Sequence, residues 1–441
     1  MQCKMKLDKL SCCPVAVSYE IWDIIKIITP LGLNLYIYNL SQHYLNSSNN
    51  ILKTFLNEVI LIILPIILHL TFTHLWSNHV IVIYILVSLF AIIYRLKANL
   101  RWKFTSTELN LTICRARSFV FIITAVAILA VDFPQYFPHS MTKSDYTGIS
   151  LMDTGIGYFI FCIGIVSKHE NLQKCMKKSI LLIVMGAART LLIILFKYHQ
   201  SELEYGTHWN AFFTIGFTQL FGNLIIHSLK HKKIIAGFGI FLVLFHEIVL
   251  QKFLFAYVMN GDNPRDNFIS ANREGLVSTI GFLAFYLICN SFSFTKQNIK
   301  SIFHYICKTF CISFTSLIIL LILLFYSNCN IARRVANLEY ILFMIFLSFF
   351  TLFLMLVAEF LSSGLNVKYE NQIFVVINFN GLIFFLITNV LTGVANMSFD
   401  LKKFTFLEMI ILLCSYMVLS YLITYLWKRY FYTKLVTKKN V

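Results

Sequence analysis

The sequence predicts an all-α protein, a polytopic transmembrane helical bundle of about thirteen spans. Of its 441 residues, 58% are hydrophobic and only 13% are charged, whereas a soluble globular chain has about 25% charged residues. The mean hydropathy is +0.73, and phenylalanine alone contributes 43 residues. Apolar runs of roughly 20 residues, the length that a helix needs to cross a bilayer, recur from one end of the chain to the other.

The apolar segments follow one another with short loops between them, so each is predicted to be one transmembrane helix. In chain order they cover residues 20–42, 55–76, 78–95, 117–132, 149–167, 178–196, 209–227, 233–257, 275–293, 303–326, 335–361, 372–396 and 404–430. The first is the weakest, because Glu20, Asp23 and Lys26 crowd its start. We find no soluble domain and no internal repeat, and we expect a single membrane domain over residues 1–441.

Lysine and arginine set the predicted orientation. The formal charge is +17, but the basic residues cluster in short loops, where they set topology and contact anionic lipid, so we expect no nucleic-acid partner. Four basic loops fall on one side of a thirteen-span chain: Arg95, Lys97, Arg101, Lys103, Arg115 and Arg117; Lys168, Lys174, Lys177 and Lys178; Lys230, Lys232 and Lys233; and Lys428, Arg429, Lys434, Lys438 and Lys439. That side is predicted to be cytosolic, with the N-terminus luminal and the C-terminus cytosolic.

Eleven cysteines are scattered along the chain without a CxxC pair or a Cys/His set of zinc spacing. We therefore expect neither a disulfide framework nor a metal site. The N-terminal residues are polar and basic and lack a small-residue cleavage site, so this segment is predicted to be retained.

The stretch from Arg117 to Ser167 holds the strongest candidates for chemistry. Asp132 ends an apolar run, where a carboxylate is costly to desolvate and burial shifts its pKa towards the range of a general base. The alternative is an interfacial aspartate that ends a helix before Phe133-Pro134. Lys143 lies in the following loop, where a cation can stabilise developing negative charge. The alternative for Lys143 is an ordinary solvated lysine.

Other polar residues at span ends are candidates for substrate binding. Asp153 lies near a helix start, where a carboxylate also suits the helix dipole, so capping competes with a functional role. His208 and Asn210 flank Trp209, for which a membrane-interface anchor is the favoured interpretation. The loops 133–148, 206–210 and 263–276 share one predicted face, as a luminal polar pocket requires.

Arginine and asparagine complete the candidate set. Asn272 and Arg273 precede a span, and Arg273 can bind phosphate bidentately. The alternative is a local pair between Arg273 and Glu274. Asn389 and Asn396 lie on one helical stripe with Thr392 and Gly393, but asparagine within a membrane is often a hydrogen bond between helices rather than a ligand-binding group.

From the residues alone, two classes of function remain: a transferase that acts on a lipid, and a secondary transporter of a lipid or small solute. The many spans and the intramembrane pair His246-Glu247 favour a transporter, but we find no repeat pair and no matched broken helices. An acyltransferase of the MBOAT class would need a buried catalytic histidine, for which His227 and His246 are the within-span candidates.

Together these motifs resemble the inositol acyltransferase family of GPI-anchor biosynthesis, the family of PIG-W and the fungal GPI-anchored wall transfer protein. The resemblance rests on AVAILAVDF, FP, Lys143, Thr147-Gly148, SLMDTGIG, HWNAFFT, NREGL, RRVANLEY and NxxTGxxN, in this order from about residue 115 to about residue 400. This chain departs from the family's pattern in the loop, where it has Pro138-His139-Ser140 and Asp145, and its Asp-to-Lys interval is one residue longer.

The resemblance implies an endoplasmic reticulum membrane enzyme with its catalytic core at about residues 115–400. It would transfer a fatty acyl group, typically palmitoyl, from acyl-CoA to the inositol 2-hydroxyl of glucosaminyl-phosphatidylinositol at the luminal face. Asp132 and Lys143 fall on the family's catalytic aspartate and lysine. The implied partners are palmitoyl-CoA, glucosaminyl-phosphatidylinositol and membrane lipids, with no further cofactor and no obligate protein partner.

We expect direct transfer without a covalent enzyme intermediate. Asp132 would accept the proton of the inositol hydroxyl, while Lys143 would offset the negative charge of the tetrahedral intermediate. His208, Asn210, Asn272 and Arg273 are predicted to bind the headgroup or the CoA phosphates.

Overall fold

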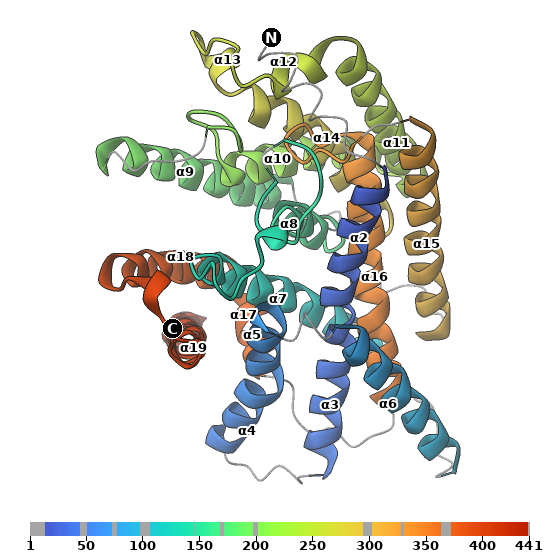
Figure 1. The fold of residues 1–441 in the computed structure, drawn as a ribbon, viewed down its shortest axis with the longest axis vertical. Helices are drawn as coiled ribbons and strands as arrows, with labels where there is room; N and C mark the ends of the chain where they lie inside the picture. Colours follow the sequence, from blue (N-terminus) through green and yellow to red (C-terminus); the bar gives the residue numbers. More distant parts are fainter. Residues whose placement is uncertain are drawn as a thin grey trace. The chain divides into compact units, whose positions relative to one another are not determined.

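The computed structural model describes residues 14–44, 51–72, 77–97, 106–144, 146–167, 172–196, 202–293, 302–327, 330–362 and 372–439. Every regular element in this part of the chain is a helix, which confirms the predicted all-α class. Figure 1 shows these helices in chain order.

Ten helical segments of the described residues are long and apolar enough to cross a membrane: Lys53–Thr71, Leu109–Ala130, Leu172–Phe196, Ala211–Leu229, Lys232–Met259, Arg273–Ser291, Ile302–Tyr326, Leu338–Ser362, Gly381–Ser398 and Phe406–Tyr430. Two shorter apolar helices, Asn78–Tyr94 and Thr154–Gly164, fall below that length. The multi-span architecture is therefore confirmed, whereas the predicted count of about thirteen spans is not.

Within the described residues, the predicted spans 20–42, 78–95 and 149–167 contain no candidate span, which accounts for the difference between thirteen and ten. Three predicted spans are divided or shortened in the structure. Residues 20–42 form two helices of 15 residues each, α2 (Pro14–Ile28) and α3 (Pro30–Tyr44), separated at Thr29. Residues 149–167 contain only the 11-residue helix α8 (Thr154–Gly164). Residues 372–396 are divided at Asn380 into α17 (Gln372–Phe379) and α18 (Gly381–Ser398).

The chain divides into two compact units. One comprises residues 1–21, 143–298 and 311–348, and the other comprises residues 22–142, 299–310 and 349–441. Because two compact units can belong to one membrane domain, the predicted single domain over residues 1–441 stays a prediction. We describe each unit by itself and refer to them as the first and second unit.

The first unit is built around α14 (Arg273–Ser291). This helix packs against α8, α10 (Ala211–Leu229) and α11 (Lys232–Val249), and α10 in turn packs against α9 (Leu172–Phe196). The hydroxyl of Tyr286, on α14, donates to Asn223 Oδ1 on α10 at 2.9 Å. The other elements of this unit are η4 (Leu250–Leu254), α12 (Phe255–Met259), α13 (Phe268–Ala271) and parts of α15 (Ile302–Ser327) and α16 (Leu338–Ser362).

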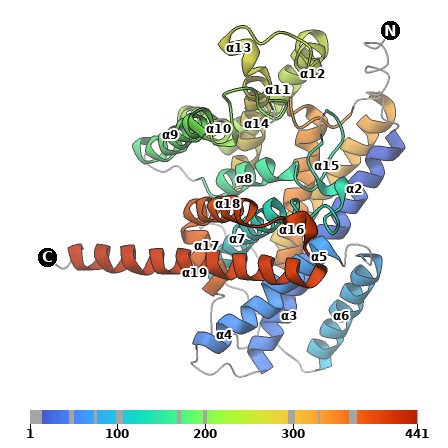
Figure 2. The same ribbon diagram turned by 60° about the vertical axis from the view of Figure 1, so that its left-hand side comes forward.

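In the second unit, α7 (Ser106–Ala130) packs against α17, α18 and α5 (Leu64–Thr71). The long helix α19 (Phe406–Lys439) lies beside α18, as Figure 2 shows. The same unit contains α3, α4 (Ile51–Glu58), η1 (Val59–Ile63) and α6 (Ser77–Lys97).

One buried ion pair joins two helices of the second unit. Arg115 and Arg117 were predicted to lie in a loop, but both belong to α7, and the guanidinium of Arg115 forms a buried ion pair with Glu359 on α16. Both partners of this pair lie inside candidate spans. Paired charges of this kind are the expected arrangement in a membrane interior.

Candidate functional site

Asp132 lies in the second unit, just after α7 ends at Ala130. Its carboxylate is half-buried, and the Nδ2 of Asn396 on α18 donates to its Oδ2 at 2.9 Å. Burial raises the pKa of the Asp132 carboxyl above its usual value, and the hydrogen bond from Asn396 offsets part of that rise. Asp132 therefore both follows a helix end and has the partly desolvated environment of a general base.

Aromatic packing fixes the backbone that carries Asp132. The Phe133 ring is buried and its centroid lies 5.9 Å from that of Phe404, in the segment between α18 and α19. The Gln135 side chain donates to the carbonyl of Lys402 at 2.9 Å, and the Tyr136 hydroxyl donates to the carbonyl of Phe404 at 3.2 Å. One ring contact and two hydrogen bonds thus connect the segment after α7, which contains Asp132, to the segment after α18.

The two asparagines of the predicted α18 stripe have different surroundings. Asn396 is exposed and contacts Asp132, as described above. Asn389 is also exposed, and its amide donates to the Phe385 carbonyl of its own helix at 2.6 Å. Thr392 is buried, with its hydroxyl 3.4 Å from that of Tyr416. The structure therefore brings Asn396, and not Asn389, to the candidate base.

Lys143 lies in the first unit, whose boundary with the second falls between Thr142 and Lys143. Its Nζ donates to both carboxylate oxygens of Glu204, at 2.9 and 2.8 Å. Glu204 belongs to the turn between α9 and α10. Burial alone would raise the pKa of the Glu204 carboxyl, but the charges of Lys143 and then of Arg333 hold it below its usual range.

Asp153 is completely buried and accepts five hydrogen bonds. Its Oδ2 accepts from the amides and hydroxyls of Ser144 and Ser150 at 2.8–3.1 Å, and its Oδ1 accepts from Arg333 Nε at 2.7 Å. Although it stands at the N-cap position of α8, its side chain makes no capping hydrogen bond. Asp153 therefore organises the loop that begins at Lys143, and its direct contact with substrate stays a prediction. The neighbouring Asp145 lies outside the described residues.

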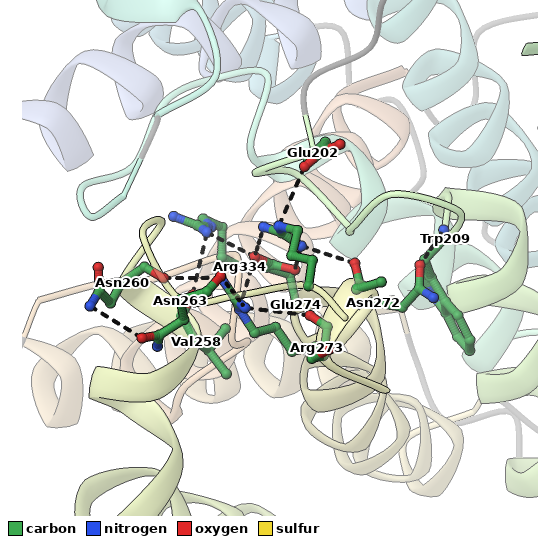
Figure 3. Close-up of polar contacts among 12 residues, drawn as sticks. Glu202, Trp209, Val258, Asn260, Asn263, Asn272, Arg273, Glu274 and Arg334 are labelled. Carbon is green, nitrogen blue, oxygen red and sulfur yellow. Dashed lines mark hydrogen bonds and ion pairs between the residues drawn. The ribbon is translucent and has the colours of Figure 1, made fainter. Parts of the chain in front are cut away.

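Two predicted motifs of the first unit meet through Asn272. Its Oδ1 accepts hydrogen bonds from the backbone amides of His208 and Trp209, both at 2.9 Å, and Figure 3 shows Asn272 beside Trp209. The Trp209 ring is 8% exposed, and its Nε1 donates to Thr214 at 2.9 Å. The interpretation of Trp209 as a membrane-interface anchor is therefore wrong, because the ring packs inside the unit. The His208 side chain is exposed.

Asn210 caps α10. Its Oδ1 accepts from the amides of Phe212 and Phe213, while its Nδ2 donates to Gly186 O at 2.9 Å and to the Thr190 hydroxyl at 3.1 Å. The side chain is buried and joins α10 to α9. Its role in substrate binding stays a prediction.

Arg273 is buried and donates to backbone carbonyls of the preceding loop. Its Nη2 donates to the Asn260 carbonyl at 3.0 Å, and its Nη1 donates to the Asn263 carbonyl at 3.2 Å (Figure 3). These bonds hold the loop between α12 and α14. A direct contact of Arg273 with phosphate stays a prediction.

Glu274 is the centre of a network of arginines that includes the expected pair with Arg273 (Figure 3). Its carboxylate is completely buried and accepts from Arg265 at 2.7 and 3.1 Å and from Arg334 at 3.2 Å. Arg265 also pairs with Glu202 at 3.4 Å. The sequence interpretation of a local pair was therefore correct but incomplete.

Sequence reasoning missed Glu202 and Glu204. The available signal was their rarity: the chain has only 20 acidic residues, and two of them fall just before Gly206 in a predicted luminal loop. Among the described residues no group of three or more histidine, cysteine, aspartate or glutamate side chains is placed to hold a metal ion. The expectation that the protein needs no further cofactor stays a prediction.

The pair His246-Glu247, which had favoured a transporter, has a local explanation. Glu247 Oε2 accepts from the amide of Leu338 at 2.8 Å, at the start of α16, and the His246 ring lies 2.9 Å from the carbonyl of Val335. Glu247 thus accepts from one of the backbone amides at the N-terminus of α16, which have no partner within the helix. His246 contacts a carbonyl of the segment just before that helix.

The helices define the class: a multi-span α-helical membrane protein. The comparison with known families is more specific. The chain belongs to the GWT1 family, whose model matches residues 16–427.

Curated relatives agree with this family. The chain is 32% identical over 306 residues to GPI-anchored wall transfer protein 1 of Kluyveromyces lactis, a match that covers 64% of this chain and 65% of the relative. It is 31% identical over 379 residues to the protein of the same name from Candida albicans, with coverage of 72% and 75%. It is 28% identical over 454 residues to glucosaminyl-phosphatidylinositol-acyltransferase PIGW of Homo sapiens, with coverage of 87% and 89%.

Proposed function

We propose that this protein is an acyl-CoA-dependent O-acyltransferase that transfers a palmitoyl group to the inositol 2-hydroxyl of glucosaminyl-phosphatidylinositol in GPI-anchor biosynthesis. Membership of the GWT1 family and the name of the human relative support the reaction and its glycolipid acceptor. The observation that carries the proposal is Asp132, a half-buried carboxylate with a raised pKa at the end of a candidate span.

Asp132 is suited to the proton transfer of this reaction. The inositol hydroxyl attacks the thioester carbonyl, and its proton passes to the Asp132 carboxylate. A C–O ester bond forms, the C–S bond breaks, and the electron pair of that bond leaves with the sulfur of coenzyme A. In the proposed mechanism the ammonium of Lys143 offsets the negative charge on the tetrahedral intermediate.

The remaining predicted residues are proposed to act at different distances from the substrate. His208, with its exposed side chain, is the candidate for direct contact with the headgroup or with CoA phosphates. Asn272 and Arg273 bond backbone groups of the surrounding loops, and Asn210 joins α10 to α9, so we propose that they support this contact by shaping the site. Asn389 remains a candidate for contact at the exposed face of α18.

A preference for long acyl chains fits the composition of the spans. Burial of apolar surface is worth about 0.8 kcal/mol per CH₂, and the apolar, Phe-rich helices offer such surface. We therefore propose palmitoyl-CoA rather than a short acyl-CoA as donor, and an endoplasmic reticulum membrane as the location.

The test compares purified wild type with Asp132→Asn in nanodiscs supplied with radiolabelled palmitoyl-CoA and glucosaminyl-phosphatidylinositol. We expect label on the glycolipid with wild type and a loss of about 10²–10⁴-fold in the variant, the usual contribution of a general base. Absence of transfer by a folded wild type would contradict the acyltransferase and favour the transporter. Equal transfer by both proteins would exclude Asp132 as the base.

A further inference from the structure

Carboxylates hold the loop that begins at Lys143. Glu204 binds the Lys143 ammonium with both oxygens, and Asp153 binds Ser144 and Ser150. Glu20 accepts from the amide of Ile149 at 2.9 Å. All of these residues belong to the first unit. The backbone is therefore held at Ser144, Ile149 and Ser150, while Glu204 binds the side chain of Lys143.

Glu204 is carried by a turn whose backbone is closed and anchored. The amide of Gly206 donates to the Glu202 carbonyl at 2.9 Å, which closes the turn. The amide of Gly275, on α14, donates to the Tyr205 carbonyl at 2.9 Å. The Arg333 guanidinium lies over the Tyr205 ring, 5.5 Å from its centroid. Glu204 thus presents its carboxylate from a fixed support.

The same arginine connects this turn to the loop. Arg333 bonds Asp153 at 2.7 Å, so Asp153 and the Glu204–Tyr205 turn are held against one residue. Asp153 in turn bonds Ser144, the residue that follows Lys143. The side chain and the backbone at Lys143 are therefore fixed by two carboxylates that share Arg333 as a neighbour.

Stability alone does not account for this arrangement. The side chains of Lys143 and Glu204 are 39% and 30% exposed, and ion pairs at such positions contribute little to stability. A free lysine samples many rotamers, whereas a lysine held by two oxygens presents its charge at one place. Fixed placement of a charge before the reaction is what lowers a barrier electrostatically.

We propose that Glu204 is the positioning residue of Lys143: its carboxylate holds the ammonium at the place where negative charge develops during acyl transfer. This inference rests on the proposed function, in which Lys143 stabilises the tetrahedral intermediate. The lowered pKa of Glu204 keeps its carboxylate ionised, and therefore paired, across the neutral range.

The first experiment measures the pairing without any turnover. Full-length protein in nanodiscs is treated with an amine-reactive ester, and acylation of Lys143 is followed by mass spectrometry. We expect Glu204→Gln to increase the labelling rate of Lys143 several-fold. The matched control is Glu202→Gln, in the same turn, because Glu202 contacts Arg265 instead. Equal labelling rates in wild type and Glu204→Gln would overturn the proposal.

The second experiment separates positioning from a structural role. We expect Glu204→Gln to lower kcat by about tenfold or more, a change of about 1.4 kcal/mol or more in the barrier, with KM for palmitoyl-CoA unchanged. We also expect the double variant Lys143→Met/Glu204→Gln to be no slower than Lys143→Met alone, because a positioning residue has no effect once its partner is absent. Unchanged kcat, or independent losses that multiply in the double variant, would overturn the proposal.

Glu204→Asp serves if Glu204→Gln does not fold, since it keeps the charge but shortens the reach by one methylene. The expected result is a labelling rate of Lys143 above that of wild type and a kcat between those of wild type and of Lys143→Met, and wild-type values of both would overturn the proposal. Failure of the proposed function looks different: wild type would transfer no palmitoyl group, while the labelling experiment would still decide whether Glu204 holds Lys143.

Discussion

Asp132 and Asp153 show how surroundings give the same side chain two different roles. Asp132 is half-buried and accepts one side-chain hydrogen bond, from Asn396, so much of its hydrogen-bonding capacity remains for a substrate proton. Asp153 is completely buried and is saturated by Ser144, Ser150 and Arg333. These bonds leave Asp153 little capacity to contact a substrate, and they join Ser144, Ser150 and Arg333, as suits a structural anchor.

The bond from Asn396 to Asp132 makes a prediction about pH. As pH falls through the pKa of Asp132, the base becomes protonated and the rate decreases. The Asn396 hydrogen bond lowers that pKa, so Asn396→Ala is expected to move the acidic limb of the kcat profile to higher pH.

Gln135→Ala is the control for this profile, because Gln135 bonds Lys402 O nearby without touching the carboxylate of Asp132. Rates for wild type and both variants would be measured from acidic to neutral pH. An acidic limb that stays in place in Asn396→Ala would show that Asn396 does not influence the base.

Residue types at the candidate site were predictable, but most of their partners were not. Asp132 stood out because a carboxylate at a span end is costly to desolvate, and Lys143 stood out as the cation in the loop that follows it. The partner of Asp132 lies 264 residues away, and that of Asp153 lies 180 residues away. Such pairings depend on how helices pack, and no local periodicity encodes them. Asn396 was a candidate for substrate binding, with a hydrogen bond between helices as the favoured interpretation, and its contact with Asp132 became visible only in the structure.

At the scale of elements, short turns and loops hold the site, and helices provide the support. The turn of residues 202–206 illustrates this. Gly206 has φ +112°, and a Cβ there would lie 2.6 Å from both Ala271 O and the Asn272 Cα. Residues other than glycine rarely adopt this conformation. The turn that carries Glu204 therefore requires glycine at this position.

Gly206→Ala is expected to destabilise the protein by about 1–3 kcal/mol through backbone strain, and to reduce acyl transfer because the turn moves. Thermal unfolding in detergent would measure the first effect. Gly237→Ala in α11 is the matched control, since nothing lies within 4 Å of the added Cβ and alanine favours a helix interior over glycine. An unchanged unfolding temperature for Gly206→Ala would contradict the strain argument.

Helix existence was predictable from apolar runs, and helix breaks were not. The run at residues 20–42 was predicted as one span, yet it divides at Thr29, before Pro30, because proline is tolerated at a helix start but not in its interior. The run at residues 149–167 is mostly apolar, but the amides of its first two residues, Ile149 and Ser150, bond Glu20 and Asp153 instead of forming a helix. Hydropathy measures the tendency of a segment to leave water. It does not show where a carboxylate side chain takes a backbone amide that a helix would otherwise use.

For the whole molecule, orientation in the membrane remains a prediction. The last candidate span ends at Tyr430, but α19 continues as a helix to Lys439, over the basic end of the chain. Nine further residues extend a helix by about 13 Å, so the basic end reaches past the apolar region. The positive-inside rule places this end in the cytosol.

An epitope tag at the C-terminus tests this orientation. In cells whose plasma membrane alone is permeabilised, we expect an antibody to reach the tag, whereas a tag at the N-terminus should need permeabilised internal membranes. A luminal protein of known orientation serves as the integrity control. The reverse labelling pattern would contradict the predicted orientation, and with it the placement of Asp132 and Lys143 at the luminal face.

The buried pair of Arg115 and Glu359 has a consequence for biosynthesis. The two residues are 244 positions apart, and a ribosome adds about 5–20 residues per second, so Glu359 is made roughly 10–50 s after Arg115. Throughout that interval α7 carries a guanidinium without this partner. The newly made helix must wait beside water, lipid headgroups or the insertion machinery, and it can settle fully only when a much later segment of the same chain arrives. Assembly of the second unit is thus timed by translation, because its buried Arg115 gains this partner only when α16 is made.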